Sequence, residues 1–385
     1  MRFKNKYIFI FFCSLILFMA CKEAYLPPEI TQTNNYLVVD GILNSSGDSS
    51  IIKLTRTRNF SDTISSINED QAIVTVESEA GNKFFLPFRS NGLYSVASLP
   101  LISTQKYRLL IKTVSGETYE SEYVQVKQTP DIDSLSWKQD AGVAITVNTH
   151  DPTGNTRYYR WEYIETYEYL PTFSSDLGYD YVNNVVYRRD SSNSIDRCWI
   201  TQLSPDIVLA TTSNLTEDLI ADYPLTFIPD NSDKISVRYS ILAKQYALTK
   251  EAFEYWQQLR KNSKELGSIF GTQPQQLNSN IRCTSDPSKP VIGFVSITSL
   301  KEKRIFIKTN EVVNWHPTSS LDQFCKEIVL SPDSVRFFLN RDHDYVPAYY
   351  ISVLPPVANP PLAVAKKICV DCTTRGGIPK KPSYW

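Results

Sequence analysis

The 385-residue sequence is poor in the residues and short motifs that mark common enzyme classes. It contains three histidines and 13 glycines. It has no G-x-S-x-G, no H-E-x-x-H and no glycine-rich phosphate loop, which are signatures of α/β-hydrolases, zinc proteases and P-loop nucleotide-binding proteins. We therefore expect a protein that is not an enzyme and that uses no cofactor.

An excess of charge of either sign is also missing. The 40 lysines and arginines nearly balance the 41 aspartates and glutamates, which gives a formal net charge of −1. A nucleic acid partner requires basic side chains that neutralise its phosphates. We therefore expect no nucleic acid partner.

Long apolar runs are absent beyond the first 20 residues. Arg2, Lys4 and Lys6 precede an apolar run over residues 7–20. This run is too short and too early for a membrane-spanning helix, and it fits the charged and apolar regions of a secretory signal. We predict a signal peptide over residues 1–20. Its removal would leave a chain long enough for two or three domains.

Cys21 stands directly after Ala20, at the end of the predicted signal. A small residue followed by cysteine resembles the lipobox of bacterial lipoproteins, which implies cleavage before Cys21 and acylation of that cysteine. The alternative is an ordinary secreted protein with a cysteine by chance near its cleavage site. Two or more acyl chains anchor a protein stably. We therefore predict lipidation at Cys21 and a lipid anchor that holds the protein on a membrane.

The residues that follow Cys21 look like a polar tether. Pro27 and Pro28 would stiffen this lipidated tether, which we place at residues 21–35. Lys22 and Glu23 resemble the surface-export signal of Bacteroidota lipoproteins. The resemblance implies a position on the cell surface.

Five cysteines remain after Cys21, and an exported chain meets an oxidising compartment. Five cysteines form at most two disulfides and leave one thiol. Cys369 and Cys372 form a C-x-x-C motif, for which a structural disulfide is favoured over zinc because zinc would need two further ligands. We expect no metal site, and the connectivity stays open. The candidate disulfide cysteines are Cys198, Cys283, Cys325, Cys369 and Cys372.

The predicted fold class is mainly β, beginning with an immunoglobulin-like β-sandwich over residues 36–129. About seven short strands alternate there with turns such as Gly81-Asn82 and Gly116-Glu117, and no helical period is present. The predicted strand segments are residues 36–42, 51–55, 72–76, 83–86, 92–94, 106–112 and 118–121.

Thr129-Pro130 marks a linker to a second β-rich domain, predicted over residues 130–345. Ile235, Val237, Tyr239 and Ile241 alternate as in a strand, and we expect residues 291–295 and 304–307 to add later strands to the same domain.

This second domain is expected to contain one helix, near residues 249–266. Thr249 is a good N-cap, Gly267 a natural stop, and the apolar stripe is typical of core packing. From residue 346 to 385 the chain is rich in proline and contains the C-x-x-C motif. We expect this tail to wrap over the second domain.

Aromatic side chains are the most suggestive candidates for binding. Trp161 lies in a tyrosine-rich strand, and Tyr179, Tyr181 and Tyr187 follow in a loop-rich insertion. Flat amphipathic rings stack on sugars or peptides while their polar groups stay wet. The alternative is that these rings pack within their own domain.

Two groups of residues could serve a hydrolase, which is the least favoured of the functions considered. His343 stands between Asp342 and Asp344, an arrangement that a general base or a polar turn would share. Glu162, Glu165 and Glu168 could supply paired carboxylates for glycoside hydrolysis, although their spacing on a strand favours no single face.

Several local patterns resemble the Bacteroidota lipoprotein family called domain of unknown function 4249. The resemblance covers nearly the whole mature chain. The patterns are Cys21, Leu37-Val38-Val39-Asp40-Gly41, Gly92-Leu93-Tyr94, Tyr107-Arg108-Leu109 with Gly116-Glu117, Tyr158-Tyr159-Arg160-Trp161, Cys198-Trp199, Gln245-Tyr246-Ala247-Leu248-Thr249, Gly293-Phe294, Cys369-Val370-Asp371-Cys372 with Gly376-Gly377, and Lys381-Pro382-Ser383-Tyr384-Trp385.

The resemblance implies an outer-membrane lipoprotein that is accessory to a TonB-dependent transporter in nutrient capture, the nutrient being a glycan or a peptide. It implies no catalytic residues. A structural or assembly lipoprotein of the cell envelope is the alternative, with the tyrosines buried against a protein partner.

Overall fold

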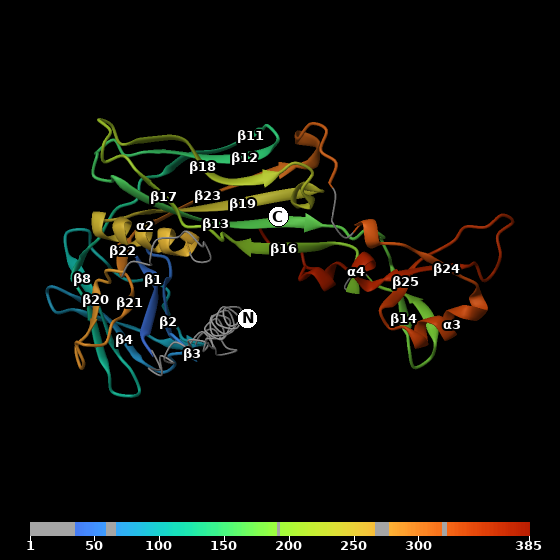
Figure 1. The fold of residues 1–385 in the computed structure, drawn as a ribbon, viewed down its shortest axis with the longest axis horizontal. Helices are drawn as coiled ribbons and strands as arrows, with labels where there is room; N and C mark the ends of the chain where they lie inside the picture. Colours follow the sequence, from blue (N-terminus) through green and yellow to red (C-terminus); the bar gives the residue numbers. More distant parts are fainter. Residues whose placement is uncertain (1–34, 59–66, 191–192, 266–276, 318–321) are drawn as a thin grey trace, which may run out of the picture.

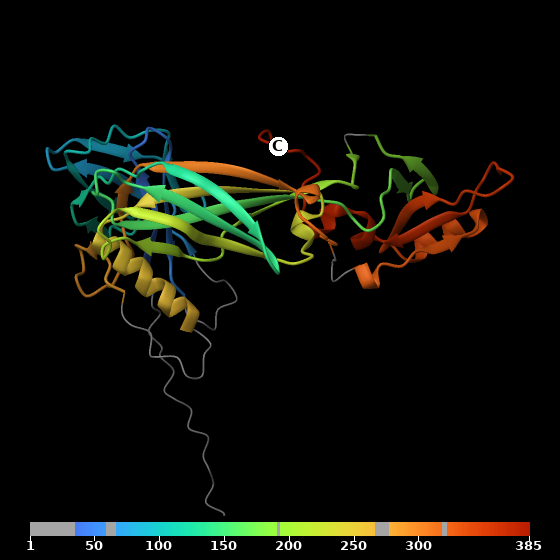
Figure 2. The same cartoon turned by 90° about the horizontal axis from the view of Figure 1, so that it is seen from above.

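The computed structural model describes residues 35–58, 67–190, 193–265, 277–317 and 322–385. The predictions for the signal peptide, for Cys21, for tether residues 21–34 and for Gly267 lie outside these residues. Within them the chain is mainly β, which confirms the predicted fold class. An N-terminal sandwich lies beside one end of a second, longer sandwich, and a C-terminal module lies at the other end (Figures 1 and 2).

The N-terminal sandwich packs two sheets face to face around one apolar core. Strand β8 shows why: its inward residues Tyr107, Leu109 and Ile111 are buried, and they alternate with more exposed residues as the two-residue period requires. The first sheet contains β1 (Leu37–Asn44), β2 (Ser50–Arg56), β3 (Ile67–Asn68), β6 (Phe88–Ser90), β7 (Leu93–Val96), β21 (Ile292–Gly293) and β22 (Ser296–Thr298). The second contains β4 (Ile73–Ser78), β5 (Lys83–Leu86), β8 (Lys106–Lys112), β9 (Thr118–Ser121), β10 (Val124–Gln125) and β20 (Ile281–Cys283).

Strands β20, β21 and β22 correct the predicted domain boundaries. We expected residues 291–295 in the second domain, but β21 and β22 pair in parallel with β1, and β20 pairs with β9. Gly293 lies opposite Val39 with φ +139°, and a Cβ there would come within 2.2 Å of the Val39 carbonyl oxygen. The N-terminal sandwich is therefore built from residues 36–129 together with a segment almost 150 residues further along the chain.

The second sandwich follows in the chain and provides the longest strands. Val143, Ile145 and Val147 of β12 face Tyr159 and Trp161 of β13 in its core. One sheet contains β11 (Ile132–Gln139), β12 (Gly142–His150) and β18 (Leu219–Pro229). The other contains β13 (Tyr158–Tyr169), β16 (Cys198–Leu203), β17 (Val208–Thr211), β19 (Arg238–Ala247) and β23 (Leu300–Lys308), with the short helices η2 (Asp233–Ile235) and η3 (Thr309–Glu311) beside it.

Helix α2 (Lys250–Glu265) joins the two sandwiches, close to the predicted position. The Thr249 hydroxyl accepts a hydrogen bond from the Ala252 amide at 3.2 Å, which caps the helix as expected. The apolar face of α2 packs on Leu209 of the second sandwich and on Phe294, whose ring lies 5.4 Å from that of Tyr255. The helix therefore serves as shared core for both units.

The predicted proline-rich tail belongs largely to a separate C-terminal module. We expected residues 346–385 to wrap over the second domain, but they supply strands and a helix that pack against the aromatic insertion. Tyr384 and Trp385 do return to the second sandwich, at β13. The module contains β14 (Leu177–Asp180), β15 (Val185–Arg188), η4 (Asp322–Phe324), β24 (Ile328–Leu330), α3 (Pro332–Arg341), β25 (Tyr345–Tyr350), β26 (Leu362–Lys366), α4 (Lys367–Val370) and η5 (Cys372–Arg375).

Candidate functional site

Trp161, one of the predicted binding residues, lies in the core of the second sandwich. Its side chain is fully buried, stacks on Tyr159 at 5.7 Å between ring centroids, and donates from Nε1 to Gln245 at 2.8 Å. A residue without exposed surface or a free polar group has nothing to offer a ligand. The prediction of Trp161 as a binding residue is corrected here to a core residue.

The three predicted tyrosines lie together on the hairpin formed by β14 and β15. Tyr179 is buried, with its ring 4.9 Å from that of Tyr181. Tyr181 is 37% exposed and stacks on His343 at 4.7 Å, and Tyr187 is 45% exposed and covers Gly178 on the opposite strand. Val182 and Val185 are exposed on the same hairpin. We call the exposed side chains of Tyr181, Val182, Val185 and Tyr187 the hairpin surface.

The carboxylates considered for hydrolysis do not come together. Glu165 points into the sandwich core, where it accepts hydrogen bonds from Lys234 and Tyr239 at 2.8 and 2.7 Å. Glu162 pairs with Arg160 and Glu168 with Arg197. Each glutamate on β13 therefore has its own partners, and His343 stacks on an aromatic ring.

Two disulfides hold the C-terminal module. Cys198 of β16 bonds Cys372, and Cys325 bonds Cys369, so the two cysteines of the C-x-x-C motif have different partners. Cys283, also a candidate, is a buried free thiol in β20. No described group of three or more histidine, cysteine or acidic side chains could hold a metal ion.

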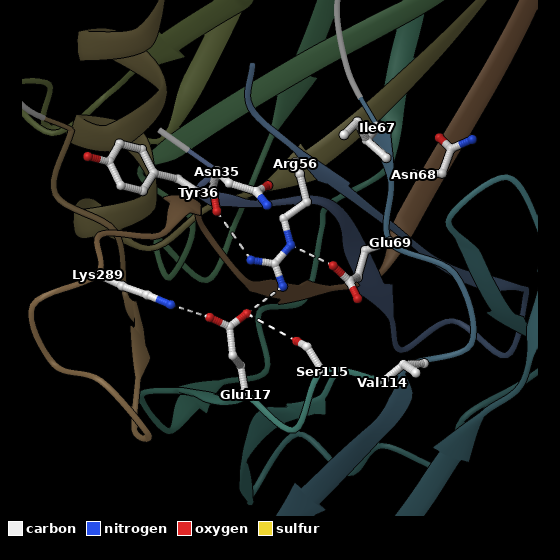
Figure 3. Close-up of a pocket in the computed structure, with 10 residues that line it drawn as sticks. All are labelled: Asn35, Tyr36, Arg56, Ile67, Asn68, Glu69, Val114, Ser115, Glu117 and Lys289. Carbon is white, nitrogen blue, oxygen red and sulfur yellow. Dashed lines mark hydrogen bonds and ion pairs between the residues drawn. The ribbon is translucent and has the colours of Figure 1, made fainter. Parts of the chain in front are cut away.

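An open cleft of about 760 Å³, lined by both charged and apolar side chains, lies at one end of the N-terminal sandwich (Figure 3). Its size falls within the range of ligand-binding pockets. The cleft opens between the end of β2, the start of β3 and the turn that joins β8 to β9. We call it the Arg56 cleft, and the residues that line it are Asn35, Tyr36, Arg56, Ile67, Asn68, Glu69, Val114, Ser115, Glu117 and Lys289.

Arg56 organises the cleft because its guanidinium bridges the two sheets. Its Nε donates to Glu69 at 2.5 Å and its Nη2 to Glu117 at 2.7 Å, while Nη1 donates to the Asn35 carbonyl and the Tyr119 hydroxyl. The Arg56 side chain is only 9% exposed. Buried charges are tolerated when they are paired in this way.

Glu117 is the second residue that holds together the hydrogen bonds and ion pairs around Arg56. It also accepts hydrogen bonds from Lys289 at 2.6 Å and from Tyr119 at 3.0 Å. Burial alone would raise the pKa of Glu117, but the bonds from Lys289, Arg56 and Tyr119 outweigh burial and lower the pKa from 4.5 to about 2. Glu117 is therefore ionised at neutral pH and supplies no proton for acid catalysis.

Part of the cleft wall remains available to a ligand. The side-chain amide of Asn68 makes no hydrogen bond within the described residues, and Lys289 and Ser115 reach the opening. Val114 is 70% and Ile67 39% exposed beside these polar groups. The cleft thus combines paired charges, polar groups at its opening and an apolar rim.

Sequence patterns did not indicate this cleft. Its residues come from five separate places in the chain, and the sequence around Arg56 is that of an ordinary strand. Among the described residues, no helix has the length and apolarity that a membrane crossing would need.

Comparison with known proteins identifies the family. The model of a family described as a domain of unknown function (DUF4249) matches residues 23–304. No curated protein matches the chain. The matched range contains the N-terminal sandwich with its later strands, α2, most of the second sandwich and the Arg56 cleft. Since the match spans well over half of the sequence, the chain belongs to the DUF4249 family.

Proposed function

We propose that the protein is a non-enzymatic lipoprotein of the outer membrane, anchored through Cys21 on the cell surface and accessory to a TonB-dependent transporter that takes up a glycan or a peptide. The anchor is supported by the signal-like residues 1–20 and the small residue before Cys21. The accessory role is supported by an exposed apolar surface in the C-terminal module, far from the N-terminal sandwich.

The observation that carries the proposal is the hairpin surface. Val182 is 87% and Val185 51% exposed, next to the partly exposed rings of Tyr181 and Tyr187. Exposed apolar and aromatic side chains that gather on one element are typical of protein interaction sites. The hairpin projects at the end of the molecule opposite the N-terminal sandwich (Figure 1), so a partner there would leave the Arg56 cleft open.

Extraction of the membrane in mild detergent, followed by affinity purification of the protein, tests the accessory role. We expect a TonB-dependent transporter to co-purify. The double substitution Val182→Ser and Val185→Ser should reduce its recovery strongly. Val313→Ser is the matched control because Val313 is 70% exposed on the second sandwich, and it should leave recovery unchanged.

Recovery of the protein as a lone monomer would contradict the proposal. Recovery with an envelope-assembly protein in place of a transporter would favour the structural alternative. Protease treatment of intact cells tests the location: we expect the protein to be digested, whereas full protection would place it on the periplasmic face.

A further inference from the structure

We propose that the Arg56 cleft binds a neutral oligosaccharide. This inference deepens the proposed capture function, on which it rests for its biological meaning, by naming the class of ligand. Its physical basis is separate, because the cleft lies in the N-terminal sandwich and the hairpin surface in the C-terminal module.

The charges in the cleft favour a ligand without net charge. Arg56 and Lys289 balance Glu69 and Glu117, and the four groups form ion pairs of 2.5 to 2.7 Å. An anionic ligand would have to displace Glu117 from Lys289, and a cationic ligand would have to compete with Arg56 for its carboxylates. Breaking such partly buried pairs is costly, so charged ligands are disfavoured.

The polar groups at the opening of the cleft suit hydroxyls. A hydroxyl both donates and accepts, so neighbouring hydroxyls of a sugar can donate to a carboxylate oxygen of Glu69 while accepting from Lys289 or the Asn68 amide. The apolar rim formed by Ile67 and Val114 would contact the C–H groups of the sugar ring. A volume of about 760 Å³ is large enough for a ligand of several sugar units.

The cleft is also held rigid before any ligand arrives. Arg56 is fixed by Glu69, Glu117 and the Asn35 carbonyl, and Lys289 is held by Glu117 (Figure 3). Groups that are already ordered lose little entropy when a ligand binds.

A peptide is the less favoured ligand for this cleft. Extended peptides are captured largely by main-chain hydrogen bonds to a free strand edge. Along the cleft, the backbone of β2 is already paired with β3, at Thr55 with Asn68 and at Arg56 with Ile67. The edge of β2 along the cleft is therefore not open to an added strand.

Calorimetric titration of the purified full-length protein tests the proposal. The probes are neutral hexasaccharides of glucose, xylose, mannose, galactose and N-acetylglucosamine, compared with oligogalacturonate and a neutral decapeptide. We expect at least one neutral hexasaccharide to bind with a Kd below about 1 mM. Asn68→Ala and Lys289→Gln should each weaken that binding about tenfold, because each removes one hydrogen-bonding group.

Two substitutions in the same sandwich serve as matched controls. Asn82→Ala and Lys112→Gln change exposed residues outside the cleft, and they should leave the affinity unchanged. Binding of oligogalacturonate or the decapeptide alone, binding of none of the probes, or sugar binding that persists in both cleft variants would overturn the proposal. Co-purification of a transporter does not depend on this titration, so failure of the sugar site and failure of the accessory role give different results.

Discussion

A single side chain, that of Arg56, holds much of the Arg56 cleft in place. Its guanidinium bonds Glu69 beside one sheet and Glu117 beside the other, while the aromatic ring of Tyr119 lies 6.0 Å away. Because the bonds to Glu117 and Tyr119 cross from the sheet of β2 to the sheet of β9, contacts that shape the cleft also hold the two sheets together.

Because Glu117 takes part in these contacts, their contribution to the stability of the fold depends on pH. Its pKa is about 2 in the folded protein and ordinarily 4.5, so the carboxylate stabilises the fold above pH 4.5. That stabilisation, about 3 kcal/mol at most, is lost as the pH falls from 4.5 towards 2. We expect the free energy of unfolding in urea to fall over this range, and to fall less in Glu117→Gln.

Glu79→Gln is the control for this pH series. Glu79 is half exposed and lies 3.9 Å from Lys106, and such surface pairs contribute little. The variant should follow the wild-type curve. A Glu117→Gln curve that also follows the wild type would contradict the assigned role of Glu117.

Because Trp161 is a core residue, its substitution should change the stability of the protein. Trp161→Ala should lower the free energy of unfolding by about 3–5 kcal/mol, because it opens a cavity in the core of the second sandwich. Trp161→Phe keeps most of the volume and should cost less. Denaturation in urea measures both, and a Trp161→Phe variant with unchanged stability but altered ligand or partner binding would show that the core assignment is wrong.

At the scale of elements, features that depend on neighbouring residues could be predicted from the sequence, whereas contacts between distant segments could not. Strands β5, β8 and β9 match the predicted segments, and Thr249 caps α2, because alternation and capping depend on neighbouring residues. The tyrosine-rich strand around Trp161 was also recognisable, but its sequence could not tell a core face from a binding face. No local sequence pattern indicated the Arg56 cleft, because its carboxylates come from separate strands and turns.

The disulfides are the second feature that local sequence could not determine. The five candidate cysteines allowed several pairings, and proximity along the chain would have suggested Cys369 with Cys372. Folding instead brings Cys198 to Cys372 across 174 residues and Cys325 to Cys369 across 44.

The Cys198–Cys372 bond should hold the C-terminal module against the second sandwich. Its removal in Cys198→Ser/Cys372→Ser is expected to destabilise the module by about 2–5 kcal/mol, because the closed loop is long. Hydrogen exchange should then quicken in β25, β26 and α4. Cys283→Ala removes a thiol outside both bridges, and it should leave exchange in the module unchanged; equal exchange in the bridge variant and the wild type would contradict the prediction.

At the scale of the whole molecule, the N-terminal sandwich depends on β20, β21 and β22. Without them β1 loses its parallel neighbours and β9 loses an antiparallel one. Buried Val291, Val295 and Ile297 would also leave the core. A fragment of residues 35–129 should therefore fail to fold cooperatively.

Circular dichroism and thermal melting of that fragment check the prediction. A synthetic peptide of residues 277–299 should restore a cooperative transition. The same peptide with Gly293→Val is the control, because a side chain at this position would collide with the Val39 carbonyl. A fragment that melts cooperatively by itself would contradict the prediction.

The divided sandwich also has a consequence for the order in which the protein matures. A chain emerges from the ribosome with its N-terminus first, so β1 appears long before its partners β21 and β22. The unit that begins the chain is completed only after the strands β11 to β19 have been made. The sandwich that follows the proposed anchor in the sequence is therefore among the last parts to close, and the Arg56 cleft, which includes Lys289, forms only when about three quarters of the polypeptide is present.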